Sequence, residues 1–158
     1  MLYVENSKLV FRFDDQKTWI EPWSDNAFRI RSTKLKDMPL EDWALLPKPY
    51  SGKWHVELHE IEKQASITNG KIRATISHRG KIVIYNSKGE RLLEEYARHR
   101  LDLTDPKCSA LGVEARELKP ILGGDYHLTM RLESVQSNGN CMAWANINIH
   151  TSISKALI

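Results

Sequence analysis

The sequence predicts a mostly-β domain, an antiparallel β-sandwich, and three features indicate this class. Apolar and polar residues alternate with a period of two in several segments, which gives each strand one apolar face. Turn sequences rich in asparagine and glycine separate the segments. The length of 158 residues fits one domain that can bury a core.

The strands are predicted one by one from these alternating rows. In the first row Leu9, Phe11 and Phe13 alternate with polar or outward-facing positions, and later rows repeat the pattern. Strands are expected around residues 8–13, 28–31, 55–59, 65–68, 71–77, 81–85, 90–96 and 125–133. The rows expected to face the interior are Phe11/Phe13, Ile72/Ile76, Ile82/Ile84 and Leu128/Met130/Leu132.

Turn residues predict how these strands connect. Asn69-Gly70 is a strong hairpin signal, and Asn86–Gly89 predicts a second hairpin, so residues 64–96 should form a meander. Gly123-Gly124 should precede the last clear strand.

Two stretches do not have a clear strand pattern. Pro39–Tyr50 contains three prolines and predicts a loop, with room for one helical turn at Leu40–Leu45. In Thr104–Glu117 the pair Asp105-Pro106 marks a turn, and Ala110–Glu117 fits either a strand or a short helix.

Composition and charge are those of an ordinary soluble protein, with 41% apolar and 27% charged residues. The net charge of +3 is scattered, without a basic run that alternates with aromatics, so no nucleic-acid partner is expected. Cys108 and Cys141 lack the spacing of a disulfide framework or a zinc site. The N-terminus does not resemble a signal peptide, and no segment is long and apolar enough for a membrane span. A cytoplasmic protein without cofactor or membrane partner is expected.

One row of side chains has the residue types of a metal site. His55, Glu57 and His59 fall on one face of a predicted strand, and two histidines with a carboxylate can bind zinc. Such a row on a sandwich is more often a solvated face, and no fourth ligand can be identified. We therefore predict no metal site.

Acidic residues could suggest glycoside hydrolysis, which needs two carboxyl groups on either side of a scissile bond. The candidates are Asp14-Asp15, Glu94-Glu95, Asp102 and Asp105. Neighbouring residues of a strand point to opposite faces, so Glu94 and Glu95 cannot converge on one sugar. No catalytic residue is assigned, and substrate-binding residues stay unknown.

Five tryptophans could stack on sugars. Filling of a core or an interface is the preferred interpretation for Trp19 and Trp23. Trp43 and Trp54 flank the proline-rich stretch, and both could be partly exposed. Trp144 lies in the C-terminal segment discussed below and is given no role.

Three segments together resemble glycoside hydrolase family 31, the α-glucosidase and α-xylosidase family. The first is Ile20–Arg31 followed by Asp42–Leu46, which is similar to an "EPWG-N-lRVR … WALL" pattern with Ser24 in place of glycine. The second runs from Ile67 to Glu95, and the third is Gly124–Glu133. Their order and spacing cover residues 1–134, most of the chain.

This resemblance implies a galactose-mutarotase-like sandwich at the N-terminus of a larger α-glycosidase. The catalytic aspartates of such an enzyme lie on a barrel that would follow Ile158, so the fragment should be inactive alone. The sandwich would brace the barrel and flank its pocket for an α-glucoside or α-xyloside.

The resemblance ends at Ser134, where the family continues into an E-K-x-Y-G-x-G-Q segment. When the codons of Asn140–Asn146 are read in a frame shifted by two bases, the first shifted codon must encode Leu, the second Tyr or His, and the third Gly. The fourth must encode Met, Leu or Val, the fifth must encode Gly, and the sixth can encode Gln. The same shift permits Lys-Gly at Lys155 and Ala156. Residues 1–134 are thus expected to be the sandwich and residues 135–158 an out-of-frame tail that is poorly ordered or borrows an open sheet edge.

Three functions remain open at this point. The first is the accessory domain of an intracellular α-glycosidase, and the second is a free carbohydrate-binding module. The third is a mutarotase-type sugar epimerase, which would use a His/Glu pair. Candidate residues for such a pair are His55, Glu57, His78, His99 and His127, although their spacing singles out no pair.

Overall fold

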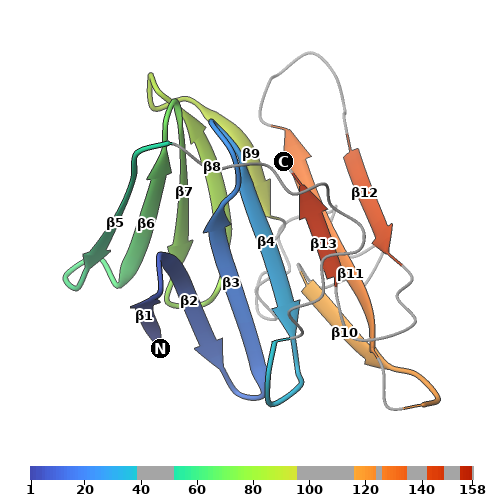
Figure 1. Ribbon diagram of the computed structural model, residues 1–158. Helices are drawn as coiled ribbons and strands as arrows, with labels where there is room; N and C mark the ends of the chain where they lie inside the picture. Colours follow the sequence, from blue (N-terminus) through green and yellow to red (C-terminus); the bar gives the residue numbers. More distant parts are fainter. Residues whose placement is uncertain (39–51, 96–115, 124–125, 135–141, 148–153, 158) are drawn as a thin grey trace, which may run out of the picture.

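Two antiparallel sheets pack face to face in the computed structural model (Figure 1). The structure describes residues 1–38, 52–95, 116–123, 126–134, 142–147 and 154–157. All regular elements of these residues are strands, so the predicted mostly-β sandwich is confirmed.

The smaller sheet has five strands in the order β1-β2-β3-β4-β13. Their bounds are β1 (Leu2–Glu5), β2 (Lys8–Phe13), β3 (Gln16–Pro22), β4 (Phe28–Thr33) and β13 (Ser154–Leu157). Each of the first four strands pairs with its neighbour in sequence, whereas β13 returns from the far end of the chain to pair with β4.

The larger sheet has eight strands, with the path β10-β11-β9-β8-β7-β6-β5 and β12 paired to β11. The bounds are β5 (Trp54–His59), β6 (Gln64–Asn69), β7 (Ile72–Ser77), β8 (Ile82–Asn86), β9 (Arg91–Glu95), β10 (Arg116–Pro120), β11 (Tyr126–Ser134) and β12 (Met142–Ile147). The meander predicted for residues 64–96 is confirmed as β6 to β9.

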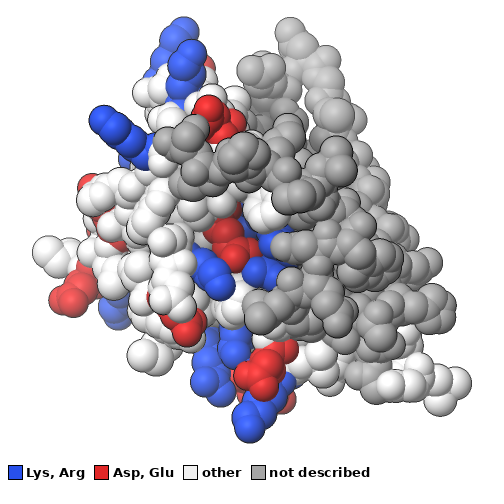
Figure 2. All heavy atoms as spheres, in the orientation of Figure 1, with Lys and Arg blue, Asp and Glu red and all other residues white. Residues whose placement is uncertain are grey.

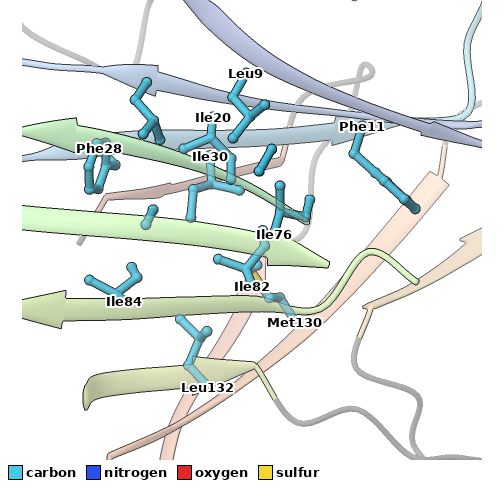
Figure 3. Close-up of a cluster of buried hydrophobic side chains, with 13 residues drawn as sticks. Leu9, Phe11, Ile20, Phe28, Ile30, Ile76, Ile82, Ile84, Met130 and Leu132 are labelled. Atoms are coloured by element: carbon cyan, nitrogen blue, oxygen red, sulfur yellow. The ribbon is translucent and has the colours of Figure 1, made fainter. Parts of the chain in front are cut away.

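The core lies between the two sheets and is built from the predicted apolar rows (Figure 3). Phe11, Ile76, Ile82, Ile84, Leu128, Met130 and Leu132 are all buried, and Ile72 is partly buried. Phe13 was predicted to face the interior, and this is wrong, because the residue is 66% exposed. It is the last residue of β2, and the chain turns at once through Asp14, so its side chain projects past the rim of the core.

The first hairpin forms one residue later than predicted. Asn69 stays in β6 opposite Ile72, and Gly70-Lys71 make the two-residue turn. The buried amide of Asn69 donates hydrogen bonds of 2.7 Å to the carbonyls of Ser24 and Ala27, which hold it in the strand. Gly70 then takes φ +60°, the positive φ that two-residue hairpin turns require at their first turn residue.

The two stretches without clear strand pattern have different outcomes. Pro39–Tyr50 lies outside the described residues, as does most of Thr104–Glu117. Arg116 and Glu117 begin β10, so the strand interpretation is confirmed for the end of that segment.

Candidate functional site

The row of His55, Glu57 and His59 lies on the outer face of β5, as predicted. His55 Nε2 is 3.2 Å and His59 Nε2 is 3.5 Å from the two carboxylate oxygens of Glu57. The three side chains are 71%, 53% and 37% exposed, and His59 Nε2 also contacts Ser66 Oγ at 3.3 Å. Among the described residues no group of three or more ligating side chains is arranged to hold a metal ion.

Glu94 and Glu95 point to opposite faces of β9, as the alternation of a strand requires. Glu94 faces outward and pairs with Lys81 and with Arg91, whose Nη1 lies 2.8 Å from the carboxylate. Partial burial acts to raise the pKa of Glu94, but the hydrogen bonds and positive charges of Lys81 and Arg91 outweigh it, so the pKa lies below its ordinary value. This carboxylate is held ionised, and a general acid needs the opposite.

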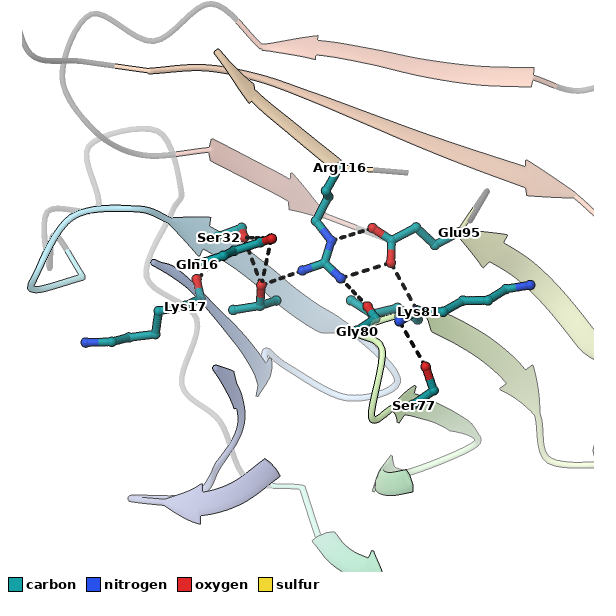
Figure 4. A network of polar contacts seen from close by, with 10 residues as sticks. Gln16, Lys17, Ser32, Ser77, Gly80, Lys81, Glu95 and Arg116 are labelled. Atoms are coloured by element: carbon teal, nitrogen blue, oxygen red, sulfur yellow. Dashed lines mark hydrogen bonds and ion pairs between the residues drawn. The ribbon is translucent and has the colours of Figure 1, made fainter. Parts of the chain in front are cut away.

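Glu95 is fully buried between the sheets and bound by Arg116 (Figure 4). Arg116 Nε donates to Glu95 Oε1 at 2.5 Å, and its Nη2 donates to Oε2 at 3.1 Å. The backbone N–H of Ile82 donates to the same carboxylate at 3.0 Å. A carboxylate with its oxygens occupied in this way has a structural role and is not open to a substrate.

The same guanidinium connects the two sheets. Arg116 Nη1 donates to Thr18 Oγ1 on β3, and Nη2 donates to the carbonyl of Gly80. Thr18 Oγ1 in turn lies 2.8 Å from Ser32 Oγ on β4. Sequence reasoning missed this network, although an inward-facing Glu95 signals that a buried cation must lie nearby.

Trp19 and Trp23 belong to a charged cluster on the outer face of the five-stranded sheet. Lys8 Nζ lies 3.9 Å and Arg31 Cζ 4.9 Å from the centroid of the Trp19 ring, and Arg29 Cζ lies 4.9 Å from that of Trp23. Such cation–π contacts fix the rings in place. Filling of a core or an interface, the preferred interpretation, is confirmed for Trp19, which is 9% exposed and packs in a buried cluster with Val10 and Met38.

Glu21 is the anion at the centre of this cluster. Its carboxylate accepts two hydrogen bonds from Arg31, of 2.8 and 2.9 Å, and lies 3.7 Å from Lys8 Nζ and 3.9 Å from Arg29 Nε. Side chains of both signs meet near the middle of the face shown in Figure 2. The three cations exceed the one acid, so the cluster is positively charged and holds no pair of carboxylates.

The remaining predicted residues are spread over the molecule. Asp14 and Asp15 are exposed in the turn between β2 and β3. Trp54 is 36% exposed, which confirms the expectation for this residue. The other candidates lie outside the described residues or have side chains that are not described: Trp43, His99, Asp102, Asp105, Cys108, His127, Cys141 and Trp144.

One small cavity brings some of the candidate histidines together. It has a volume of about 210 Å³ and is lined by Leu2, Leu58, His59, Glu60 and His78, among others. This is below the roughly 300–1,000 Å³ of ordinary small-molecule pockets. His55 and Glu57 are not part of it.

Relatives of known family match this chain in sequence and in fold. An uncharacterized family 31 glucosidase, ORF2, of Pseudescherichia vulneris is 35% identical over 134 residues, which is 80% of this chain and 25% of that protein. A crystal structure of a GH31 α-xylosidase from a soil metagenome, complexed with xylose, is 41% identical and superposes with a TM-score of 0.74. The match covers 86% of this chain.

In sequence and in fold, this chain is similar to part of a family 31 glucosidase and of a GH31 α-xylosidase. No family model matches it. The chain spans about a quarter of the curated family 31 relative and about a fifth of the solved one, where it corresponds to the N-terminal domain. The expected resemblance to family 31 and the expected β-sandwich are thus confirmed. No helix of the described residues is long and apolar enough to cross a membrane.

Proposed function

We propose that this chain is the non-catalytic N-terminal sandwich of an α-glycosidase that acts on an α-glucoside or α-xyloside. The observation that carries the proposal is the partial match, which leaves about three quarters of the family 31 glucosidase beyond it. In the intact enzyme, the sandwich braces the catalytic barrel and flanks its substrate pocket.

The chemistry of the described acids supports an accessory role. Retaining and inverting glycosidases place two carboxyl groups roughly 5–9.5 Å apart with open space between them. Glu94 is held ionised on the outer face, while Glu95 is enclosed by Arg116 on the inner face. Neither can act on a sugar together with the other.

We also propose that residues 135–158 are an out-of-frame tail and that the sandwich proper ends near Ser134. The shifted reading of Asn140–Asn146, which forces both glycines of the family's Y-G-x-G-Q segment and permits its other residues, supports this proposal. The backbone pairing of β12 and β13 is compatible with it, because strand addition at a sheet edge tolerates almost any sequence.

The function is tested with the purified chain. We expect no turnover of aryl α-glucosides or aryl α-xylosides, and no appreciable heat in calorimetric titrations with glucose and xylose. Turnover by the purified chain would refute the accessory role, while sugar binding at millimolar concentration or better without turnover would favour a carbohydrate-binding module.

The frame is tested by sequencing the encoding DNA. The proposal requires that a one-base correction between the codons of Ser134 and Asn140 opens a frame that continues into a barrel. If the stop codon after Ile158 is followed by DNA that encodes no barrel in any reading frame, a frameshift is excluded.

A mutarotase-type activity ranks after the carbohydrate-binding module, and the observation that favours it is that His78, one of the candidate histidines, lines a cavity together with Glu60. Polarimetry of fresh α-glucose measures it directly. A rate above that of buffer, lost in His78→Asn, would replace the accessory role as the function of this chain.

A further inference from the structure

We infer that two copies of this chain associate through β5, by antiparallel pairing of β5 with β5 of the second copy. The inference goes beyond the proposed enzymatic role, and it rests on the geometry and the side-chain order of one edge strand.

β5 ends the path of the eight-stranded sheet among the described residues, and it is the outermost strand on one side of Figure 1. All six of its residues pair with β6 without a bulge, so its other edge presents a regular row of backbone donors and acceptors. Natural edge strands are commonly protected by proline, lysine or a bulge, and Trp54–His59 contains none of these.

The inner face of β5 is apolar and incompletely covered. Val56 packs against the core, whereas Trp54 is 36% and Leu58 is 48% exposed. On the opposite sheet, β5 faces β1, a strand of four residues. A second strand beside β5 would cover these apolar side chains.

The order of side chains along β5 is self-complementary in one register. If Val56 lies opposite Val56 of the second copy, Trp54 lies opposite Leu58, and His55 lies opposite Glu57. Each of these pairs occurs twice because of the twofold symmetry, which is how an isologous contact is built. Cross-strand apolar pairs stabilise neighbouring strands, and the carboxylate of Glu57 can accept a hydrogen bond from the imidazole of His55 opposite it.

Neighbouring registers are less favourable. A shift of one step in one direction places His55 opposite His55 of the second copy and Leu58 opposite Gly52, so Leu58 loses its apolar partner. A shift of one step in the other direction places Glu57 opposite Glu57 of the second copy, so two carboxylates face each other. A shift in the same direction by one further step pairs Glu57 with His59 but leaves Trp54 without a partner. The contacts of Glu57 with both histidines in one chain, at 3.2 and 3.5 Å, show that these side chains reach one another along the outer face.

The test is sedimentation velocity of the whole chain at increasing concentration. A six-residue strand pair is smaller than a standard interface, so we expect a monomer at a few micromolar and a dimer at roughly several hundred micromolar. A chain that stays monomeric over this range, or that dimerises equally well after the changes below, would overturn the inference.

A charge exchange identifies the strand and its register. His55→Glu and Glu57→His each place like groups opposite one another, and each should weaken dimerisation at least tenfold. The double variant restores the pair with its polarity reversed and should recover most of the dimer. Both substituted side chains are exposed, so unchanged circular dichroism and melting temperature of the three variants are the expected folding control.

His59→Glu is the matched control on the same face. In the inferred register it lies opposite Lys53 of the second copy, so dimerisation should be unchanged or stronger. Loss of the dimer in His59→Glu would instead place Glu57 opposite residue 59, and this would refute the register with Val56 at the twofold axis.

Discussion

Removal of the Arg116 side chain should destabilise the sandwich more than removal of any other described Lys or Arg side chain, because the carboxylate that pairs with Arg116 is fully buried. The side chain of Glu95 is 0% exposed and that of Arg116 is 6% exposed. In Arg116→Met the carboxylate of Glu95 keeps the N–H of Ile82 but loses the guanidinium, and Thr18 and Gly80 lose a donor.

The expected loss follows from the cost of leaving one charge of a buried pair alone. Breaking such a pair costs about 3–5 kcal/mol, a large share of the roughly 5–15 kcal/mol that stabilises a typical domain. Replacing both partners by apolar groups of similar volume is often close to neutral. The double variant Arg116→Met/Glu95→Leu should therefore be more stable than Arg116→Met alone.

The assay is urea unfolding followed by circular dichroism, with the midpoint and the slope fitted separately. Arg91→Met is the control, because Arg91 is 52% exposed and forms an ion pair with Glu94. This surface pair should contribute about 0–1 kcal/mol. If Arg116→Met were no less stable than Arg91→Met, or if the double variant were the least stable, the argument from burial would be refuted.

Four further predictions test other parts of the structure. Gly80→Ala should cost about 1–3 kcal/mol more than Gly89→Ala in thermal unfolding, because both have positive φ but only at Gly80 would a new Cβ lie 2.7 Å from the Phe11 ring. Ile67→Ala should cost about 2–5 kcal/mol, while Ile61→Ala, at a side chain 97% exposed, should change stability by less than about 0.5 kcal/mol. Since the pKa of Glu94 is lowered on folding, its contribution to stability is present above the unfolded pKa and is lost as pH falls through 4.5 and below; Glu94→Gln should flatten this part of a stability–pH curve. If residues 135–158 are an out-of-frame tail, limited proteolysis should cut first between Ser134 and Gly139, and resistance of this segment would count against that proposal.

Most strands could be predicted because their cause is local. The alternation that buries Ile82 and Ile84, or Leu128 and Met130, can be recognised within a few consecutive residues. Its period of two follows directly from strand geometry. The same rule correctly separated Glu94 from Glu95. It did not apply to Phe13, because alternation says which face a residue is on and not where the opposing sheet ends.

The polar contacts between the sheets could not be predicted in the same way. Arg116 is 21 residues from Glu95 and 98 residues from Thr18 along the chain, so no local pattern joins them. The hairpin at Gly70 shifted by one residue for a similar reason. The carbonyls of Ser24 and Ala27, more than 40 residues away, hold Asn69 in its strand. The Asn69-Gly70 sequence by itself does not indicate these distant contacts.

The edges of the two sheets explain how the C-terminal strands find a place in the fold. β13 pairs with β4 and β12 pairs with β11, so both occupy the edges on one side of the sandwich, opposite β1 and β5. Edge pairing uses backbone N–H and C=O groups, which every residue except proline provides in full, so a segment need not have evolved with the sandwich to add a strand to it. The same backbone chemistry is available at β5, where the self-complementary order of Trp54, His55, Glu57 and Leu58 makes a second copy of the chain the best partner.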